Sequence, residues 1–168
     1  VLAVIFLATS VATGVAVIMQ MGDDNQTNSE TTQQAEGNTA NKENTLQGTK
    51  LADFEPVQQV TELQKIDTQV GNGEEVKAGA TVTAHYTGAI ASTGVIFQSS
   101  LDMGDPIEFP LSGVIKGWTE GVPGMKVGGK RRLIIPAAQA YGEQSPSADI
   151  PANADLVFDI EITAVKNP

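Results

Sequence analysis

Apolar and polar residues alternate through much of the chain from about residue 61 onward, which is the spacing of half-buried β-strands. The alternation is cleanest over 155–164, where it predicts a strand with one core face and one solvent face. The predicted core face is Leu156, Phe158, Ile160 and Ile162, and the predicted solvent face is Val157, Asp159, Glu161 and Thr163. Shorter strands are predicted at 62–70, 81–88, 95–99, 106–111 and 130–135.

One segment between these strands has helical spacing instead. Val114, Ile115 and Trp118 stand at positions i, i+1 and i+4, so a short helix over 114–121 turns all three to one side. Gly121 is a suitable residue to end that helix. Many short strands with a single helix indicate an α+β domain in which an antiparallel sheet curls over the helix. The only tryptophan, Trp118, is then either a core residue or the floor of a pocket.

Residues 1–21 carry no charged side chain and few polar ones. At the rise of an α-helix, such a run is about long enough to cross a hydrocarbon core of roughly 30 Å. We therefore expect a membrane anchor at 1–21, with a cleaved secretory signal as the alternative. The flank that follows this segment carries no Lys or Arg until Lys42, so the positive-inside rule places the following domain outside the cytoplasm, either membrane-anchored or secreted.

The next segment, 22–55, is rich in Asn, Thr, Gln, Glu and Ser and shows no apolar period. Such a composition buries too little apolar surface to offset the entropy of ordering the chain, so a disordered linker is expected. The remaining residues, 56–168, form the predicted folded domain. A chain of 168 residues has room for one such domain and these two appendages.

The amino-acid composition argues against several classes of function. Asp and Glu total 20 against 10 Lys and Arg, and this acidic balance argues against a nucleic-acid partner, because phosphate contacts need clustered cations. The chain has no cysteine and one histidine, so a thiolate nucleophile is excluded and a histidine-based metal site or Ser-His-Asp triad is disfavoured. We expect no metal and no cofactor.

Short motifs follow one another along the predicted domain: AHYTG at 84–88, GVIFQSS at 94–100, VIKGW at 114–118, MKVGG at 125–129, AYG at 140–142, IP at 150–151 and LVFD at 156–159. Their order and spacing over about residues 61–166 resemble the FKBP-type peptidyl-prolyl cis/trans isomerases. The resemblance implies an antiparallel sheet of five to six strands wrapped around one short helix, which agrees with the fold class inferred from the pattern. It implies that proline-containing polypeptides, and the macrolide inhibitors of the family, are the ligands.

The resemblance also implies a site. In the family the tryptophan is the floor for the proline ring, the tyrosine of AYG donates a hydrogen bond to a bound carbonyl, and the backbone N–H of the isoleucine before proline donates another. Carried over to this chain, the implied catalytic residues are Tyr86, Phe97, Trp118, Tyr141 and Phe158. The implied substrate-binding residues are Gln98, Val114, Ile115 and Ile150.

Some positions depart from the family pattern. Gln98 stands where the family usually has Asp, and Ile107 stands where it has an aromatic residue. The leading hypothesis is an isomerase that acts on exported proteins. These departures keep a second hypothesis open, a noncatalytic module that holds proline-containing segments or acts as a chaperone. A purely structural exported domain is favoured if Trp118 is inaccessible.

Overall fold

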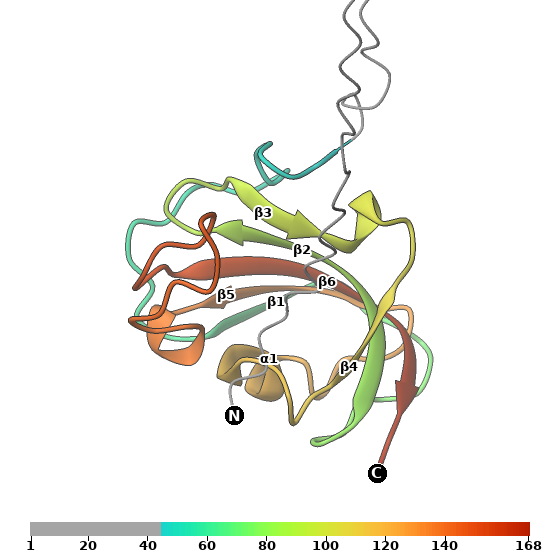
Figure 1. The fold of residues 1–168 in the computed structure, drawn as a ribbon. Coiled ribbons are helices and arrows are strands. Elements are labelled where there is room, and N and C mark those ends of the chain that lie inside the picture. The colour runs from blue at the N-terminus through green and yellow to red at the C-terminus, as the bar shows by residue number, and fades with distance from the viewer. Residues whose placement is uncertain (1–44) are drawn as a thin grey trace, which may run out of the picture. The chain divides into compact units, whose positions relative to one another are not determined.

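The structure, a computed structural model, describes residues 45–168. The predicted segment 1–21 and most of the predicted linker lie outside the described residues. A curved antiparallel sheet holds one short helix, α1, inside its curve (Figure 1). The elements are β1 (Gln64–Gln69), β2 (Thr81–Ile90), β3 (Ile96–Ser99), η1 (Ser100–Asp102), β4 (Ile107–Pro110), α1 (Lys116–Gly121), β5 (Lys130–Ile135), η2 (Ala137–Gln139) and β6 (Leu156–Lys166).

The sheet has six strands in the order β1-β5-β6-β2-β3, and β4 also pairs with β2. The predicted fold class, α+β with an antiparallel sheet of five to six strands around one short helix, is confirmed. β5 has the bounds that the alternation predicted, whereas β2 and β6 each continue two residues further. Within residues 45–168, no helix is long and apolar enough to cross a bilayer.

The core lies between α1 and the concave face of the sheet. The predicted core face of β6 is confirmed, since its side chains are at most 2% exposed. The prediction for Val157 is wrong, because this side chain is 0% exposed although it lies on the opposite face. That opposite, outer face carries a second apolar cluster: Leu51, Val60, Ala89, Ala91, Ile96, Ile134 and Val157.

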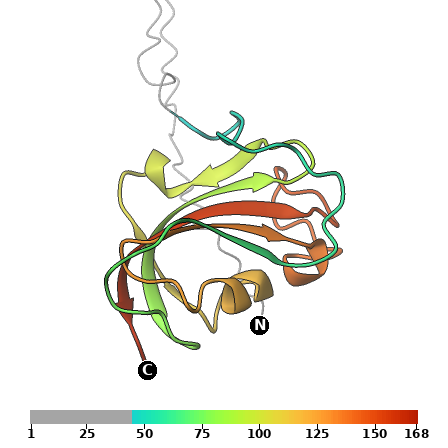
Figure 2. The ribbon, with the colours of Figure 1, turned by 180° about the vertical axis from the view of Figure 1, so that it is seen from behind.

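The segment 45–60 covers this second cluster (Figure 2). The N–H of Gly48 donates to the carbonyl of Ile96 at 2.8 Å, and the N–H of Ile96 donates to the carbonyl of Thr49 at 2.8 Å. Residues 45–55, which the sequence analysis assigned to the disordered linker, therefore pack on the domain. The prediction missed this because Leu46, Leu51 and other apolar residues are too widely spaced there to form a period.

Helix α1 is shorter than predicted, and its last residue, Gly121, lies where the sequence placed the end of the helix. It begins at Lys116, and Ile115 precedes it in an extended conformation with φ −61° and ψ 152°. Gly121 is the last helical residue, and its role is close packing: a Cβ there would lie 2.6 Å from Leu133 Cδ1. A Cβ at Gly117 would lie 2.4 Å from Ile135 Cγ2. The two glycines thus let the helix approach β5.

The packing of Leu51 predicts that the segment 45–60 stabilises the domain. Leu51 is 7% exposed in the outer cluster. We expect Leu51→Ala to lower the free energy of unfolding of the full chain by about 2–3 kcal/mol, the lower part of the range for leucine truncation in cores. Leu101→Ala is the control, because Leu101 is 54% exposed. Equal denaturant midpoints for the two variants would contradict the assignment of this segment to the fold.

Candidate active site

The indole of Trp118 lies at the centre of a cluster of aromatic rings from four elements. Its ring centroid is 5.2 Å from Phe109 of β4, 5.5 Å from Phe158 of β6 and 5.9 Å from Tyr86 of β2. All three pairs are edge-to-face, with interplanar angles of 68–89°. Such T-shaped pairs are favourable for the ring quadrupoles and are typical of well-packed cores.

Phe97 extends the cluster from β3, with its ring 5.7 Å from that of Phe158. The pairing of β2 with β3 shifts register at Gly88, which is opposite Gln98. A Cβ at Gly88 would lie 2.5 Å from Phe97 Cζ and 2.7 Å from Phe158 Cε1. This glycine of the AHYTG motif therefore leaves the space in which the two phenylalanine rings meet.

Of the other predicted residues, Gln98 lies in β3 opposite Gly88, and the remaining four lie on the loops around this cluster. Ile115 and Ile150 are buried, at 4% and 1% exposed, and Val114 is half-buried. Tyr141 follows η2 and is 9% exposed. The N–H of Ile150, which the resemblance assigns to a ligand carbonyl, donates to the carbonyl of Ser147 at 3.2 Å in this structure.

Phe109 belongs to the cluster and was missed as a site residue by the sequence analysis. Its position could have been found from the alternation in the predicted strand 106–111. Ile107 and Phe109 are two residues apart and pair with Ala84 and Val82, so both lie on the concave face. Phe109 is buried, and Ile107, at the position of the family's aromatic residue, is half-buried.

Two polar atoms in this apolar cluster have no hydrogen-bond partner among the described residues: Tyr86 Oη and Trp118 Nε1. Both are buried donors, and leaving such a group unpaired costs about 1–3 kcal/mol. Burial, and to a smaller extent the nearby Tyr141, raises the pKa of Tyr86 to about 12. The hydroxyl therefore stays protonated at neutral pH and is available to donate to a ligand oxygen.

The aromatic rings leave little surface open. Trp118 is 0% exposed, Tyr86 and Phe158 are each 2% exposed, and Phe97 is 5% exposed. A ligand reaches the indole only when the surrounding side chains move. Taken alone, the burial of Trp118 favours the alternative of a purely structural domain.

A hollow of about 590 Å³ lies on the outer face of the sheet, among His85, Thr87, Arg132, Asp159 and other residues. Of the predicted site residues, it includes Tyr86 alone. His85 Nδ1 lies 3.1 Å from Ser100 Oγ, but Ser100 is 0% exposed and its hydroxyl bonds the backbone of Tyr86. No group of His, Cys, Asp or Glu within residues 45–168 is suitable to hold a metal ion.

Comparison with known proteins agrees with this geometry. The family model for FKBP-type peptidyl-prolyl cis-trans isomerases matches residues 72–163, more than half of the chain. The chain therefore belongs to this family. The crystal structure of FkpA from Escherichia coli is similar with a TM-score of 0.58 and 40% identity, covering 68% of this chain and 54% of that chain.

Curated relatives support the same assignment. A probable FKBP-type peptidyl-prolyl cis-trans isomerase of Haemophilus influenzae is 45% identical over 106 residues, which are 63% of this chain and 43% of the relative. The FKBP-type isomerase FkpA of Aeromonas hydrophila is 48% identical over 100 residues, 60% of this chain and 37% of that protein. The chain thus spans less than half the length of these two relatives.

Burial of the two tyrosines predicts an unusual alkaline titration. Burial raises the pKa of Tyr141 as well as that of Tyr86, so neither side chain ionises near pH 10 while the domain is folded. Because the folded pKa of Tyr86 is raised to about 12, its contribution to stability is full below about pH 10 and is lost as the pH rises toward 12. Absorbance at 295 nm measures the tyrosinate, with the chain in concentrated guanidinium as the control. A tyrosine that titrates normally in the folded chain contradicts this prediction.

Proposed function

We propose that this chain is a peptidyl-prolyl cis/trans isomerase that binds proline in the cluster around Trp118. The observation that carries the proposal is the combination of an apolar aromatic cluster with two unpaired buried donors, in a chain of this family. A proline ring supplies apolar surface, and the flanking carbonyls supply the acceptors that Tyr86 and Trp118 lack. Such a ligand would therefore provide acceptors for the two unpaired donors, which a purely structural core leaves unexplained.

The chemistry needs neither a nucleophile nor a metal. Resonance holds the X–Pro amide planar, with a rotation barrier of about 18–20 kcal/mol, and exchange takes tens of seconds or longer. The twisted amide is less dipolar than the planar one, so an apolar site that excludes water favours it relative to the ground state. Every 1.4 kcal/mol or so gained in this way accelerates rotation about tenfold.

We assign the residues of the site the following roles. The rings of Tyr86, Phe97, Trp118 and Phe158 supply the water-excluding surface, and Phe109 packs edge-to-face against the indole. Tyr141 is the proposed donor to the ligand carbonyl. Ile115, Ile150 and Val114 border the bound segment, and Gln98 faces the cluster from β3 without the charge of the family's aspartate.

A noncatalytic module that binds proline-containing segments is the second candidate. The uncharged Gln98 and the closed arrangement of the rings favour it, because a site that must open spends binding energy on reorganisation. The same pocket is proposed to bind the macrolide inhibitors of the family. Binding and catalysis are therefore measured separately.

The test is the cis-to-trans rate of a short X–Pro peptide with the full chain and four variants. We expect Tyr141→Phe to lower kcat/KM roughly tenfold, the scale of one lost hydrogen bond, and Trp118→Leu to lower it further. Phe54→Leu is the aromatic control, since Phe54 stacks with Arg132 on the outer face. Gln98→Asp restores the family residue and is expected to raise the rate.

The outcomes separate the two candidates. No acceleration by the folded wild-type chain overturns the enzyme proposal. Saturable quenching of Trp118 fluorescence by the peptide or by a macrolide then supports the binding module, whereas no response to either supports a purely structural domain. If only the Gln98→Asp variant accelerates isomerisation, glutamine in place of the family's aspartate at position 98 is the change that turned a catalyst into a binder.

We propose further that the domain works outside the cytoplasm on exported proteins, tethered by residues 1–21. The uncharged sequence of this segment and the lack of Lys or Arg between residue 21 and Lys42 support this location. In fractionated cells, the full chain is expected in the membrane and accessible to protease from outside. Val11→Arg adds a central charge costing roughly 2.5–3.5 kcal/mol and should reduce insertion. A chain found intact in the cytosol contradicts the proposal, and a shortened exported chain favours the cleaved signal.

A further inference from the structure

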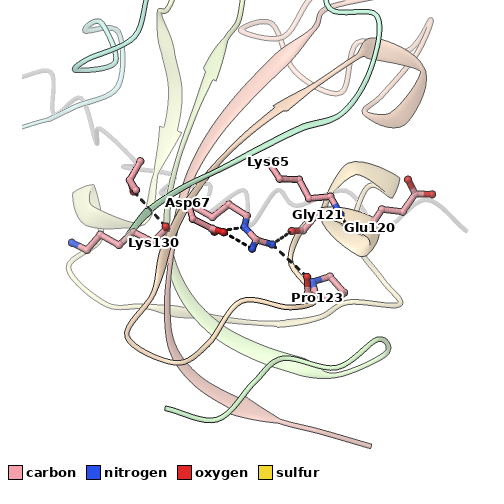
Figure 3. A network of polar contacts seen from close by, with 8 residues as sticks. Lys65, Asp67, Glu120, Gly121, Pro123 and Lys130 are labelled. Carbon is pink, nitrogen blue, oxygen red and sulfur yellow. Dashed lines mark hydrogen bonds and ion pairs between the residues drawn. The ribbon is translucent and has the colours of Figure 1, made fainter. Parts of the chain in front are cut away.

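Positively charged side chains of the sheet, rather than of α1 itself, contact the C-terminal end of α1. Arg131 Nη1 of β5 donates to the carbonyl of Gly121 at 2.7 Å and, more weakly, to that of Pro123 at 3.4 Å (Figure 3). Lys65 Nζ of β1 donates to the carbonyl of Glu120 at 2.8 Å. Carbonyl groups that a helix end leaves without partners are thus satisfied by strand side chains.

Arg131 is held in place by Asp67. The guanidinium makes two bonds to the carboxylate, from Nε to Oδ1 at 2.6 Å and from Nη2 to Oδ2 at 3.0 Å. The side chain of Arg131 is 9% exposed and that of Asp67 is 47% exposed. The hydrogen bond from Arg131 is the main cause that lowers the pKa of Asp67, so this carboxylate remains ionised at neutral pH. A bidentate pair of this kind fixes orientation as well as distance.

Helix α1 depends on such external contacts. It has six residues, and isolated helices of this length are unstable in water. Its N-cap, Ile115, makes no side-chain cap bond, and its last turn contains no basic residue. The positive charge that favours a helix C-terminus therefore comes from Arg131 and Lys65.

We propose that Arg131, oriented by Asp67, is a positioning residue for the proline site: it fixes the end of α1 and thereby the direction of the Trp118 indole. Trp118 is three residues before Gly121, and its carbonyl accepts a bond from the N–H of Val122 in the same turn. The glycines of α1 set how closely the helix approaches β5. Arg131 adds the contact that sets its rotation. This proposal rests on the isomerase function proposed above.

The chain contains a matched control in the next residue. Arg132 also makes a bidentate pair, with Asp159, at 2.6 and 2.8 Å. Its other bonds go to the carbonyls of Ala52 and Asp53 on the outer face. Adjacent residues of a strand point to opposite faces, so Arg131 and Arg132 form equivalent ion pairs, one toward α1 and the other away from it.

The experiment compares Arg131→Met with Arg132→Met, and Asp67→Asn with Asp159→Asn, in the full chain. Peptide isomerisation gives kcat and KM, thermal unfolding gives stability, and fluorescence reports the single tryptophan directly. For Arg131→Met we expect kcat to fall about tenfold with little change in KM, as for a misplaced site residue, together with a red shift and easier acrylamide quenching. Asp67→Asn gives the same changes to a smaller extent. Arg131→Lys keeps the charge at the helix end and recovers part of kcat.

The outer-face variants are expected to lose stability while kcat and the emission of Trp118 stay at wild-type values. Equal kinetic losses in the Arg131 and Arg132 variants, or a change in unfolding temperature without any change in kcat and emission, overturns the positioning role. If Arg131→Met does not fold, the Asp67→Asn variant tests the positioning role in its place. Asp67 is half-exposed, so this substitution disturbs the core less. A wild-type chain without activity overturns the proposed function instead, and the emission spectra still test whether Arg131 positions the indole.

Discussion

The closeness of α1 to β5 is the constraint on which the rest of the site depends. Gly117 and Gly121 are one helical turn apart, and a methyl group at either would overlap Ile135 or Leu133. Because the helix lies so near the sheet, the indole of Trp118 comes within ring contact of side chains from three strands. A helix held further out would leave a gap in the core and would remove the edge-to-face packing of the cluster.

The rings of the aromatic cluster are well packed, but two of its polar atoms lack hydrogen-bond partners among the described residues. Its rings meet in favourable geometries and exclude solvent, while Tyr86 Oη and Trp118 Nε1 lack acceptors among the described residues. Natural proteins accept such local costs mainly where function requires them. The cluster therefore combines the density of a core with the unsatisfied polar groups of a binding site.

The sequence predicted the concave side of the domain well and the convex side poorly. Alternation placed Phe158 and Ile160 correctly because a period of two leaves little choice of face on a well-ordered strand. Val157 was misplaced because the pattern within one strand does not show that a distant segment covers its outer side. Leu51 was missed for the same reason, since its burial depends on residues far away along the chain. Gly121 was recognised as the end of the helix, but its close contact with β5 is a tertiary property.

The segment that covers the outer cluster also determines where mechanical load enters the domain. The N–H groups of Leu46 and Gln47 donate to the two carboxylate oxygens of Asp102, at 2.7 and 3.1 Å, and the following residues bond Ile96 of β3. A pulling force applied at residue 45 would therefore act first on η1 and on the edge strand β3. Trp118 is on α1, inside the curve of the sheet and away from that edge (Figure 1). Such a force would reach the aromatic cluster through Phe97 of β3 before it reached the indole itself.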